Sequence, residues 1–232
     1  ARAWSELMLR LGYTRYVATG GDWGGVVTDL MAVQAPPGLI GMHTNFPGTV
    51  PPEIDKLIWA GSPLPSGLSA DEKLACDMLA FTYKNVQYAF YMASRPQTLY
   101  AIADSPVGLA AWLHDPINLD MIARSFDGVP EGLTRDDVLD NCTHFWLTNT
   151  GVSAGRLYRE NTYWLSPKGV NIPAAVSVFP DEVYQAPRSW AEKAYPKLVH
   201  FNKVAKGGHF AAWEQPKIFT DELRVGFRSL RG

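Results

Sequence analysis

The run Gly20-Gly21-Asp22-Trp23-Gly24-Gly25 constrains the fold of this chain more than any other segment, because it places an acidic residue in a small-residue turn. Residues 15–19, just before the run, predict a short buried strand, and residues 26–33 continue with the spacing of a helix. Asp22 is therefore predicted to stand on a strand–turn–helix elbow, which is where a tight turn can display a nucleophile.

A nucleophile raised on a strained turn needs neighbours without bulky side chains, and Gly20, Gly24 and Gly25 meet this requirement. Because the central residue is aspartate rather than serine, the covalent intermediate would be an alkyl ester of a carboxylate. The hexapeptide alone fits a loop with an acidic turn residue equally well. Other segments of the chain have to decide between the two interpretations.

Two later segments supply partners for Asp22. His209 follows two glycines just past the apolar stretch 198–201, and the predicted strand in 172–178 leads into Phe179-Pro180-Asp181-Glu182. Nucleophile, acid and base then occur in the order Asp22, Glu182, His209, each beyond the end of a predicted strand. This is the order of the α/β-hydrolase triads. In open α/β sheets, the strand ends of this kind form the ligand crevice.

The Gly-Gly-Asp-Trp-Gly elbow, the Phe-Pro-Asp-Glu segment, the Gly-Gly-His-Phe-Ala-Ala block and the stretch 104–112 together resemble the epoxide hydrolases of the microsomal type. The resemblance covers nearly the whole chain and implies an α/β-hydrolase core, a mostly parallel sheet flanked by helices, with a helical lid. By motif, Asp22 corresponds to the nucleophile and His209 to the water-activating base. Glu182 corresponds to the acid that orients the base, because it is the fourth residue of its motif, and Asp181 is the competing acid.

The same resemblance implies two lid tyrosines that donate hydrogen bonds to the epoxide oxygen. Tyr88 precedes the segment 92–96 at the spacing of the first, and Tyr158 in Tyr-Arg-Glu-Asn matches the second. Phenols aimed at an oxygen that develops negative charge stabilise it without reorganisation. Tyr88 also lies in an aromatic stretch that would serve equally well to pack a lid core. The backbone N–H of Trp23 is the candidate donor to the oxyanion of the second step.

The implied reaction opens an epoxide to a vicinal diol. Asp22 attacks an epoxide carbon to form a hydroxyalkyl ester, and water activated by His209 and Glu182 then hydrolyses this ester. We expect no cofactor and no metal. The partners are a small apolar epoxide and water, and the aromatic, proline-rich lid suggests a bulky substrate. Two alternatives stay open: a haloalkane dehalogenase, which also has Asp-Trp at its elbow, and a non-catalytic ligand-binding protein of the same fold.

The sequence departs from the family upstream of the elbow. The early strands and the loop that carries the second oxyanion donor are absent, and residues 1–11 predict an amphipathic helix with Trp4, Leu7, Met8 and Leu11 on one face. We expect an upstream polypeptide or a homo-oligomer to complete the core, because an open sheet edge would otherwise be exposed.

Composition fits a compact domain: the chain has 232 residues, of which 47% are hydrophobic and 19% charged, with a formal net charge of −2. The absence of a basic cluster argues against nucleic acid as a partner, and the sequence contains no membrane segment. Cys76 and Cys142 have neither metal nor disulfide spacing, so a cytoplasmic location is expected.

Three domain segments are predicted: residues 1–48 form the first part of the core, 49–164 the helical lid, and 165–232 the second part of the core. Within the lid, residues 70–93 and 136–158 show the clearest helical patterns, and a closing helix is expected over 213–230. His43 and His200 have no motif partners and are expected to be surface or packing histidines.

Overall fold

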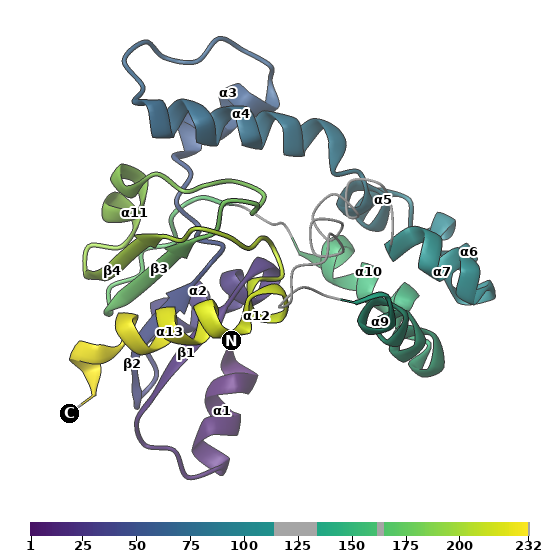
Figure 1. The fold of residues 1–232 in the computed structure, drawn as a ribbon, viewed down its shortest axis with the longest axis horizontal. Coiled ribbons are helices and arrows are strands. Elements are labelled where there is room, and N and C mark those ends of the chain that lie inside the picture. The colour runs from purple at the N-terminus through teal and green to yellow at the C-terminus, as the bar shows by residue number, and fades with distance from the viewer. Residues whose placement is uncertain (114–133, 162–164, 232) are drawn as a thin grey trace. The chain divides into compact units, whose positions relative to one another are not determined.

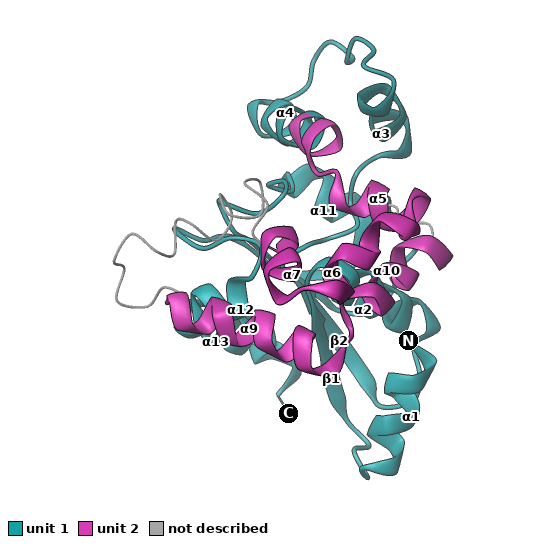
Figure 2. Ribbon diagram, turned by 90° about the vertical axis from the view of Figure 1, so that its right-hand side faces the viewer, with its two compact units in different colours: residues 1–80, 164–232 teal, residues 81–163 magenta. Residues whose placement is uncertain are grey.

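The structure, a computed structural model, describes residues 1–113, 134–161 and 165–231. It divides into two compact units (Figure 2). The sheet unit comprises residues 1–80 and 164–232, and the helical unit comprises residues 81–163. The domain limits predicted after residues 48 and 164 stay a prediction, and residues 114–133 of the predicted lid lie outside the described residues.

The sheet unit is built on four parallel strands in the order β1-β2-β3-β4 (Figure 1). They are β1 (Tyr16–Gly20), β2 (Leu39–Thr44), β3 (Ala174–Val178) and β4 (Leu198–Lys203). Every residue of β3 is buried, and β2 is buried at all but one, as expected for interior strands of a parallel sheet. One register row crosses the whole sheet: Thr19 pairs with His43, His43 with Ala175, and Ala175 with His200.

Because the strands are parallel, all four carboxyl ends meet at one edge of the sheet. The residues that follow β1, β2, β3 and β4 therefore converge there, although the segment between β2 and β3 is more than a hundred residues long. The strands expected at the elbow, before Phe179 and before Gly207 are all present, so the sequence prediction of a parallel α/β sheet is confirmed.

The sheet unit also contains helices, and α4 extends from it past residue 80 into the helical unit. The helices are α1 (Arg2–Arg10), α2 (Asp22–Gln34), α3 (Pro52–Trp59), α4 (Ala70–Asn85), α11 (Arg188–Ala194), α12 (Ala211–Glu214), α13 (Pro216–Gly226) and the 3-10 turn η2 (Arg228–Leu230). Helix α2 packs on β1 and β2, whereas α13 packs on β3 and β4. The expected single closing helix is broken at Gln215, because Pro216 has no N–H to continue it and instead begins α13.

Helix α1 forms as predicted, but none of its residues is buried. Trp4, on the predicted apolar face, is 56% exposed, and Leu7 and Leu11 are exposed as well. Among the described residues, no helix is both long and apolar enough to cross a membrane.

The helical unit contains short helices around a small apolar core of Met92, Leu99, Ile102 and Leu109. The helices are α5 (Tyr88–Ser94), η1 (Pro96–Leu99), α6 (Tyr100–Asp104), α7 (Pro106–Leu113), α9 (Arg135–Thr148) and α10 (Gly151–Glu160). A capping box between Thr134 and Asp137 begins α9.

Two helices that were predicted to be continuous are each interrupted in the structure. The pattern over 136–158 breaks at Asn149, which takes the left-handed conformation with φ of 51° and ends α9. The pattern over 70–93 breaks after Asn85, where the side-chain amides of Asn85 and Gln87 donate to the carbonyls of Phe81 and Lys84. Apolar periodicity continues through both breaks, which is why the sequence alone did not reveal them.

Candidate active site

The elbow forms where β1 ends at Gly20 and α2 begins at Asp22, one turn earlier than the sequence suggested. Asp22 has φ of 48°, in the left-handed region that side-chain-bearing residues rarely adopt, so the turn holds it under strain. A Cβ atom on Gly20 would lie 2.1 Å from the carbonyl oxygen of Gly24. The strand and the first turn of the helix can therefore approach each other only because residue 20 is glycine.

The structure corrects the assignment of the other small neighbours. A Cβ atom on Gly24 would meet nothing within 4 Å, so the prediction that its small size is needed was wrong. Gly25 is needed, because its Cβ would lie 2.9 Å from the Phe46 carbonyl oxygen. Gly21, which the sequence interpretation did not single out, would place its Cβ 2.7 Å from Oδ1 of Asn45.

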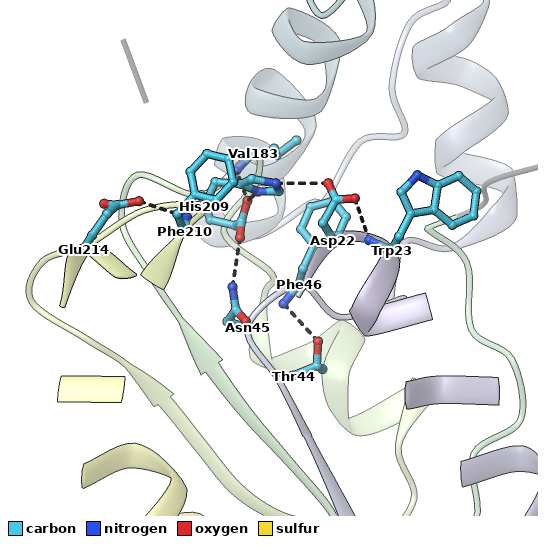
Figure 3. Close-up of polar contacts among 10 residues, drawn as sticks. Asp22, Trp23, Thr44, Asn45, Phe46, Val183, His209, Phe210 and Glu214 are labelled. Atoms are coloured by element: carbon cyan, nitrogen blue, oxygen red, sulfur yellow. Dashed lines mark hydrogen bonds and ion pairs between the residues drawn. The ribbon is translucent and has the colours of Figure 1, made fainter. Parts of the chain in front are cut away.

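The three residues expected to form a triad lie together at the carboxyl edge of the sheet, and Figure 3 shows Asp22 and His209 pointing toward one another. His209 Nε2 lies 3.0 Å from Oδ2 of Asp22, and His209 Nδ1 lies 2.6 Å from Oε1 of Glu182. Asp22 follows β1, Glu182 follows β3, and His209 lies in the loop after β4. One imidazole thus bridges two carboxylates through its two ring nitrogens.

Glu182 is buried, and its carboxylate is held by three donors. Its Oε1 accepts the Val183 N–H at 2.7 Å in addition to the His209 contact, and its Oε2 accepts from Nδ2 of Asn45 at 3.3 Å. The competing acid, Asp181, contacts the histidine loop through its backbone, since its N–H donates to the Gly207 carbonyl.

Curated proteins similar to this chain are named epoxide hydrolases. A Stigmatella aurantiaca protein named "Putative epoxide hydrolase" is 43% identical over 235 residues, and Epoxide hydrolase 1 of Sus scrofa is 31% identical over 244 residues. These alignments cover 100% and 97% of this chain, but 51% and 53% of the relatives. The chain therefore spans about half the length of the curated relatives it matches. No protein-family model matches it.

Solved structures agree with the sequence relatives. Juvenile hormone epoxide hydrolase from Bombyx mori superposes with a TM-score of 0.80 at 27% identity, covering 99% of this chain and 58% of that one. The Aspergillus niger epoxide hydrolase gives 0.78 at 28% identity, covering 98% and 56%. The chain has the α/β-hydrolase fold, and it is similar over nearly its whole length to proteins named epoxide hydrolases. The resemblance expected from the motifs is confirmed.

The charges around His209 shift its pKa. Burial lowers the pKa of His209, but the charge of Glu182 and the contacts with Asp22 outweigh burial and raise it well above its usual value. Burial raises the pKa of Asp22, yet its hydrogen bond to His209, the histidine's charge and the Trp23 N–H together lower it. These contacts therefore favour the protonated form of His209 and the charged form of Asp22.

The remaining predicted residues of the family pattern lie in two places. The Trp23 N–H donates to Oδ1 of Asp22 at 2.5 Å, so this amide lies beside the carboxyl carbon. Tyr88, the first residue of α5, and Tyr158 of α10 belong to the helical unit, where their rings lie edge to face with centroids 5.7 Å apart. The structure thus brings the two tyrosines together within their own unit.

Sequence reasoning missed several residues around Asp22, Glu182 and His209. Asn45 and Phe46 directly follow β2, and the ring of Phe46 packs edge to face on His209 with centroids 5.7 Å apart. Phe210 packs against the same imidazole at 5.0 Å. Position after a strand end was the signal that could have identified Asn45. Among the described residues, no group of three or more His, Cys, Asp or Glu side chains could hold a metal ion.

Proposed function

We propose that this protein hydrolyses epoxides to vicinal diols through a covalent hydroxyalkyl ester on Asp22. The observation that carries the proposal is the placement of His209, with Nε2 3.0 Å from Asp22 and Nδ1 2.6 Å from Glu182. A carboxylate on a strained elbow beside an imidazole fits nucleophilic attack followed by hydrolysis. The similarity to proteins named epoxide hydrolases supports the same reaction class.

In the first half of the reaction, an oxygen of Asp22 attacks an epoxide carbon from the face opposite the breaking C–O bond. The new bond is an ester, and the electron pair of the broken bond goes to the epoxide oxygen. For this oxygen we propose Tyr88 and Tyr158 as donors, one of which transfers its proton. Two adjacent phenols in the helical unit support these roles, because the charge develops on a single atom.

Ester formation consumes the charge of Asp22 and prepares His209 for the second half. One of the two carboxylates that raise the pKa of His209 is then neutral, so the imidazolium releases its proton more easily and restores the phenol. The neutral Nε2 accepts a proton from water, and the resulting hydroxide attacks the ester carbonyl carbon. Glu182 stabilises the imidazolium that forms again.

The tetrahedral intermediate of this second half carries a negative oxygen on the former Asp22 carboxyl group. We assign the Trp23 N–H as one donor to it, since this amide already donates to Oδ1 of Asp22. Collapse of the intermediate breaks the ester C–O bond, and the leaving oxygen takes up the proton of the hydroxyl group that came from water. The diol is released, and Asp22 returns to a carboxylate that keeps one oxygen from water. Overall, one epoxide and one water give one diol.

We propose that the substrate is a small-molecule apolar epoxide with a bulky substituent, such as an aryl or terpenoid-like epoxide.

The first test compares turnover of a chromogenic aryl epoxide with halide release from a haloalkane, using the unaltered protein and Asp22→Ala. Diol formation that disappears in Asp22→Ala is expected. Halide release would instead show that the protein is a dehalogenase. If the folded protein turned over neither substrate, a ligand-binding role would be favoured.

A second test traps the intermediate. His209→Gln removes the base but leaves Asp22 intact, so the ester should form and persist. Mass spectrometry should then find the mass of the epoxide added to the peptide that contains Asp22. A folded His209→Gln protein that acquires no adduct would contradict the covalent mechanism.

A further inference from the structure

Glu214 is a buried carboxylate beside the loop that carries His209, and the reaction as described does not use it. It is the last residue of α12 and is only 5% exposed. Its Oε1 accepts the Phe210 N–H at 2.9 Å (Figure 3), and the Gly208 N–H donates to the same carboxylate. One side chain therefore binds the backbone amides on both sides of His209.

Phe210 and Glu214 exchange two hydrogen bonds. While the Phe210 N–H donates to the Glu214 carboxylate, the Glu214 N–H donates to the Phe210 carbonyl at 2.9 Å. Burial raises the pKa of Glu214, and the two amide hydrogen bonds oppose the rise. A carboxylate is kept in a buried place only when such donors compensate its lost hydration.

The loop needs an anchor of this kind because the sheet does not hold it. β4 ends at Lys203, so His209 lies several residues beyond the last strand hydrogen bond. Before His209 in the chain, the Asp181 N–H donates to the Gly207 carbonyl, and Asp181 and Gly208 form an isolated parallel β-bridge. Glu214 provides the attachment on the other side, which leaves His209 between two fixed points.

We propose that Glu214 is a positioning residue that fixes the backbone of His209, so that its two ring nitrogens reach Asp22 and Glu182 together. The inference rests on the proposed function, and it assigns Glu214 to one half of the reaction. Ester formation needs Asp22 and the phenols, whereas ester hydrolysis needs the imidazole in place. Loss of Glu214 should therefore slow hydrolysis of the ester much more than its formation.

The test follows the two steps separately in Glu214→Leu and Glu214→Gln by rapid mixing with epoxide and quenching for mass analysis. In Glu214→Leu, decay of the ester should slow on the order of 10²-fold, since a misplacement of about 1 Å has this effect. Glu214→Gln keeps a carbonyl oxygen for Phe210 and should show a smaller slowing. Both kcat and KM should fall together, with kcat/KM retained.

The control is Glu222→Gln, which removes another largely buried carboxylate of the sheet unit, on α13 and away from the triad. A general loss of folded protein would lower the amount of ester formed without changing its decay rate, in the control and the Glu214 variants alike. Equal slowing of both steps, or unchanged ester decay in Glu214→Leu, would overturn the proposal.

Hydrogen exchange provides a measurement that needs neither turnover nor a folded variant. In the unaltered protein, the Phe210 amide should exchange much more slowly than an unstructured amide, because its acceptor is the Glu214 side chain. Fast exchange would overturn the positioning role. If the unaltered protein forms neither ester nor diol, the proposed function fails, and the exchange result still decides whether Glu214 holds the loop.

Discussion

The sheet unit contains two clusters made of the same chemical parts. In the elbow cluster (Asp22, Asn45, Glu182, His209), the Glu182 carboxylate binds a histidine at 2.6 Å and an asparagine amide at 3.3 Å. In the sheet cluster (Thr19, His43, Ser177, His200, Asn202, Glu222), the Glu222 carboxylate likewise binds His200 and Asn202, each at 2.8 Å. Only the first cluster includes a second carboxylate.

Their positions in the fold differ as well. The elbow cluster lies on loops beyond the strand ends, whereas the sheet cluster lies within the strands and on α13. Ser177 donates to Glu222 at 2.8 Å and contacts Nε2 of His43 at 3.0 Å, and His43 Nδ1 contacts Thr19 at 3.0 Å. Because Ser177 gives its single proton to Glu222, Nε2 of His43 is the donor to Ser177.

The difference shows most clearly in two buried histidines. Burial lowers the pKa of His43 to about 4, since its neighbours Thr19 and Ser177 are uncharged and the charge of Glu222 compensates only in part. His209 is also buried, but two carboxylates raise its pKa well above the usual value. The two histidines therefore differ in their direct partners: carboxylates contact both ring nitrogens of His209, whereas hydroxyl groups contact both ring nitrogens of His43.

The largest expected effect comes from removing the charge of each glutamate in turn. Glu182→Gln should lower kcat on the order of 10⁴-fold, as when the acid of a triad loses its charge, because the imidazolium is no longer stabilised. Glu222→Gln should leave kcat unchanged and cost about 1–3 kcal/mol of unfolding free energy. Steady-state turnover and denaturant unfolding of both variants measure the two effects. Equal loss of kcat in both would remove the distinction between the clusters.

The two histidines should tilt the pH dependence of stability in opposite directions. Between pH 6.5 and 4, unfolded His43 binds a proton that the folded protein excludes, so the unfolding free energy should fall by about 3 kcal/mol as the pH falls. The raised pKa of His209 has the opposite sign, because the folded protein holds a proton that the unfolded chain releases above pH 6.5.

Denaturant unfolding from pH 4 to 9 gives the unfolding free energy as a function of pH and checks both predictions. His43→Gln should flatten the acid limb of this curve, where the unfolding free energy falls as the pH is lowered from 6.5. His209→Gln should flatten its alkaline limb, where the unfolding free energy falls as the pH rises above 6.5. Glu222 and His200 also face His43, the first raising and the second lowering its pKa. An acid limb that is the same in His43→Gln as in the unaltered protein would show that His43 does not carry it.

A smaller effect is expected from the hydroxyl that joins the parts of the sheet cluster. Ser177→Ala removes one hydrogen bond to a carboxylate and one to His43, which should cost about 2 kcal/mol of unfolding free energy. Thr19→Val removes only the bond to Nδ1 of His43 and should cost about 1 kcal/mol. Urea unfolding at pH 7 measures both, and a larger loss in Thr19→Val would contradict the proposed direction of the hydrogen bonds.

The sequence predicted which residues lie together where short motifs identify them. Asp22, Glu182 and His209 follow predicted strands, and parallel strands bring their ends to one edge, so their proximity could be expected. His43 and His200 were expected to be surface or packing histidines, and the structure buries His43 completely. Their hydrogen bonds to Ser177 and Glu222 depend on strand register and on the position of α13.

Contacts between distant segments could not be predicted in the same way. Gly21 and Gly24 look alike in sequence, yet only a Cβ atom on Gly21 would meet Asn45, a residue that directly follows another strand, β2. The hydrogen bond from the Phe210 N–H to Glu214 depends on α12, which has only four residues. A helix of this length is too short to show an apolar periodicity in the sequence. The end of α9 at Asn149 depends on the left-handed backbone conformation of that residue rather than on the apolar pattern of the sequence.

The asparagines give the smallest and sharpest comparison. Asn45 donates to Glu182 at 3.3 Å, a long hydrogen bond, and Asn202 donates to Glu222 at 2.8 Å. Asn202→Leu should therefore cost about 1–2 kcal/mol of unfolding free energy and leave kcat unchanged. Asn45→Leu should cost less stability but lower kcat about fivefold, an activation free energy of about 1 kcal/mol, because Glu182 then orients His209 less firmly. Turnover and urea unfolding of the two variants decide the matter: if Asn45→Leu altered stability alone, Asn45 would belong with the packing of the sheet rather than with the elbow cluster.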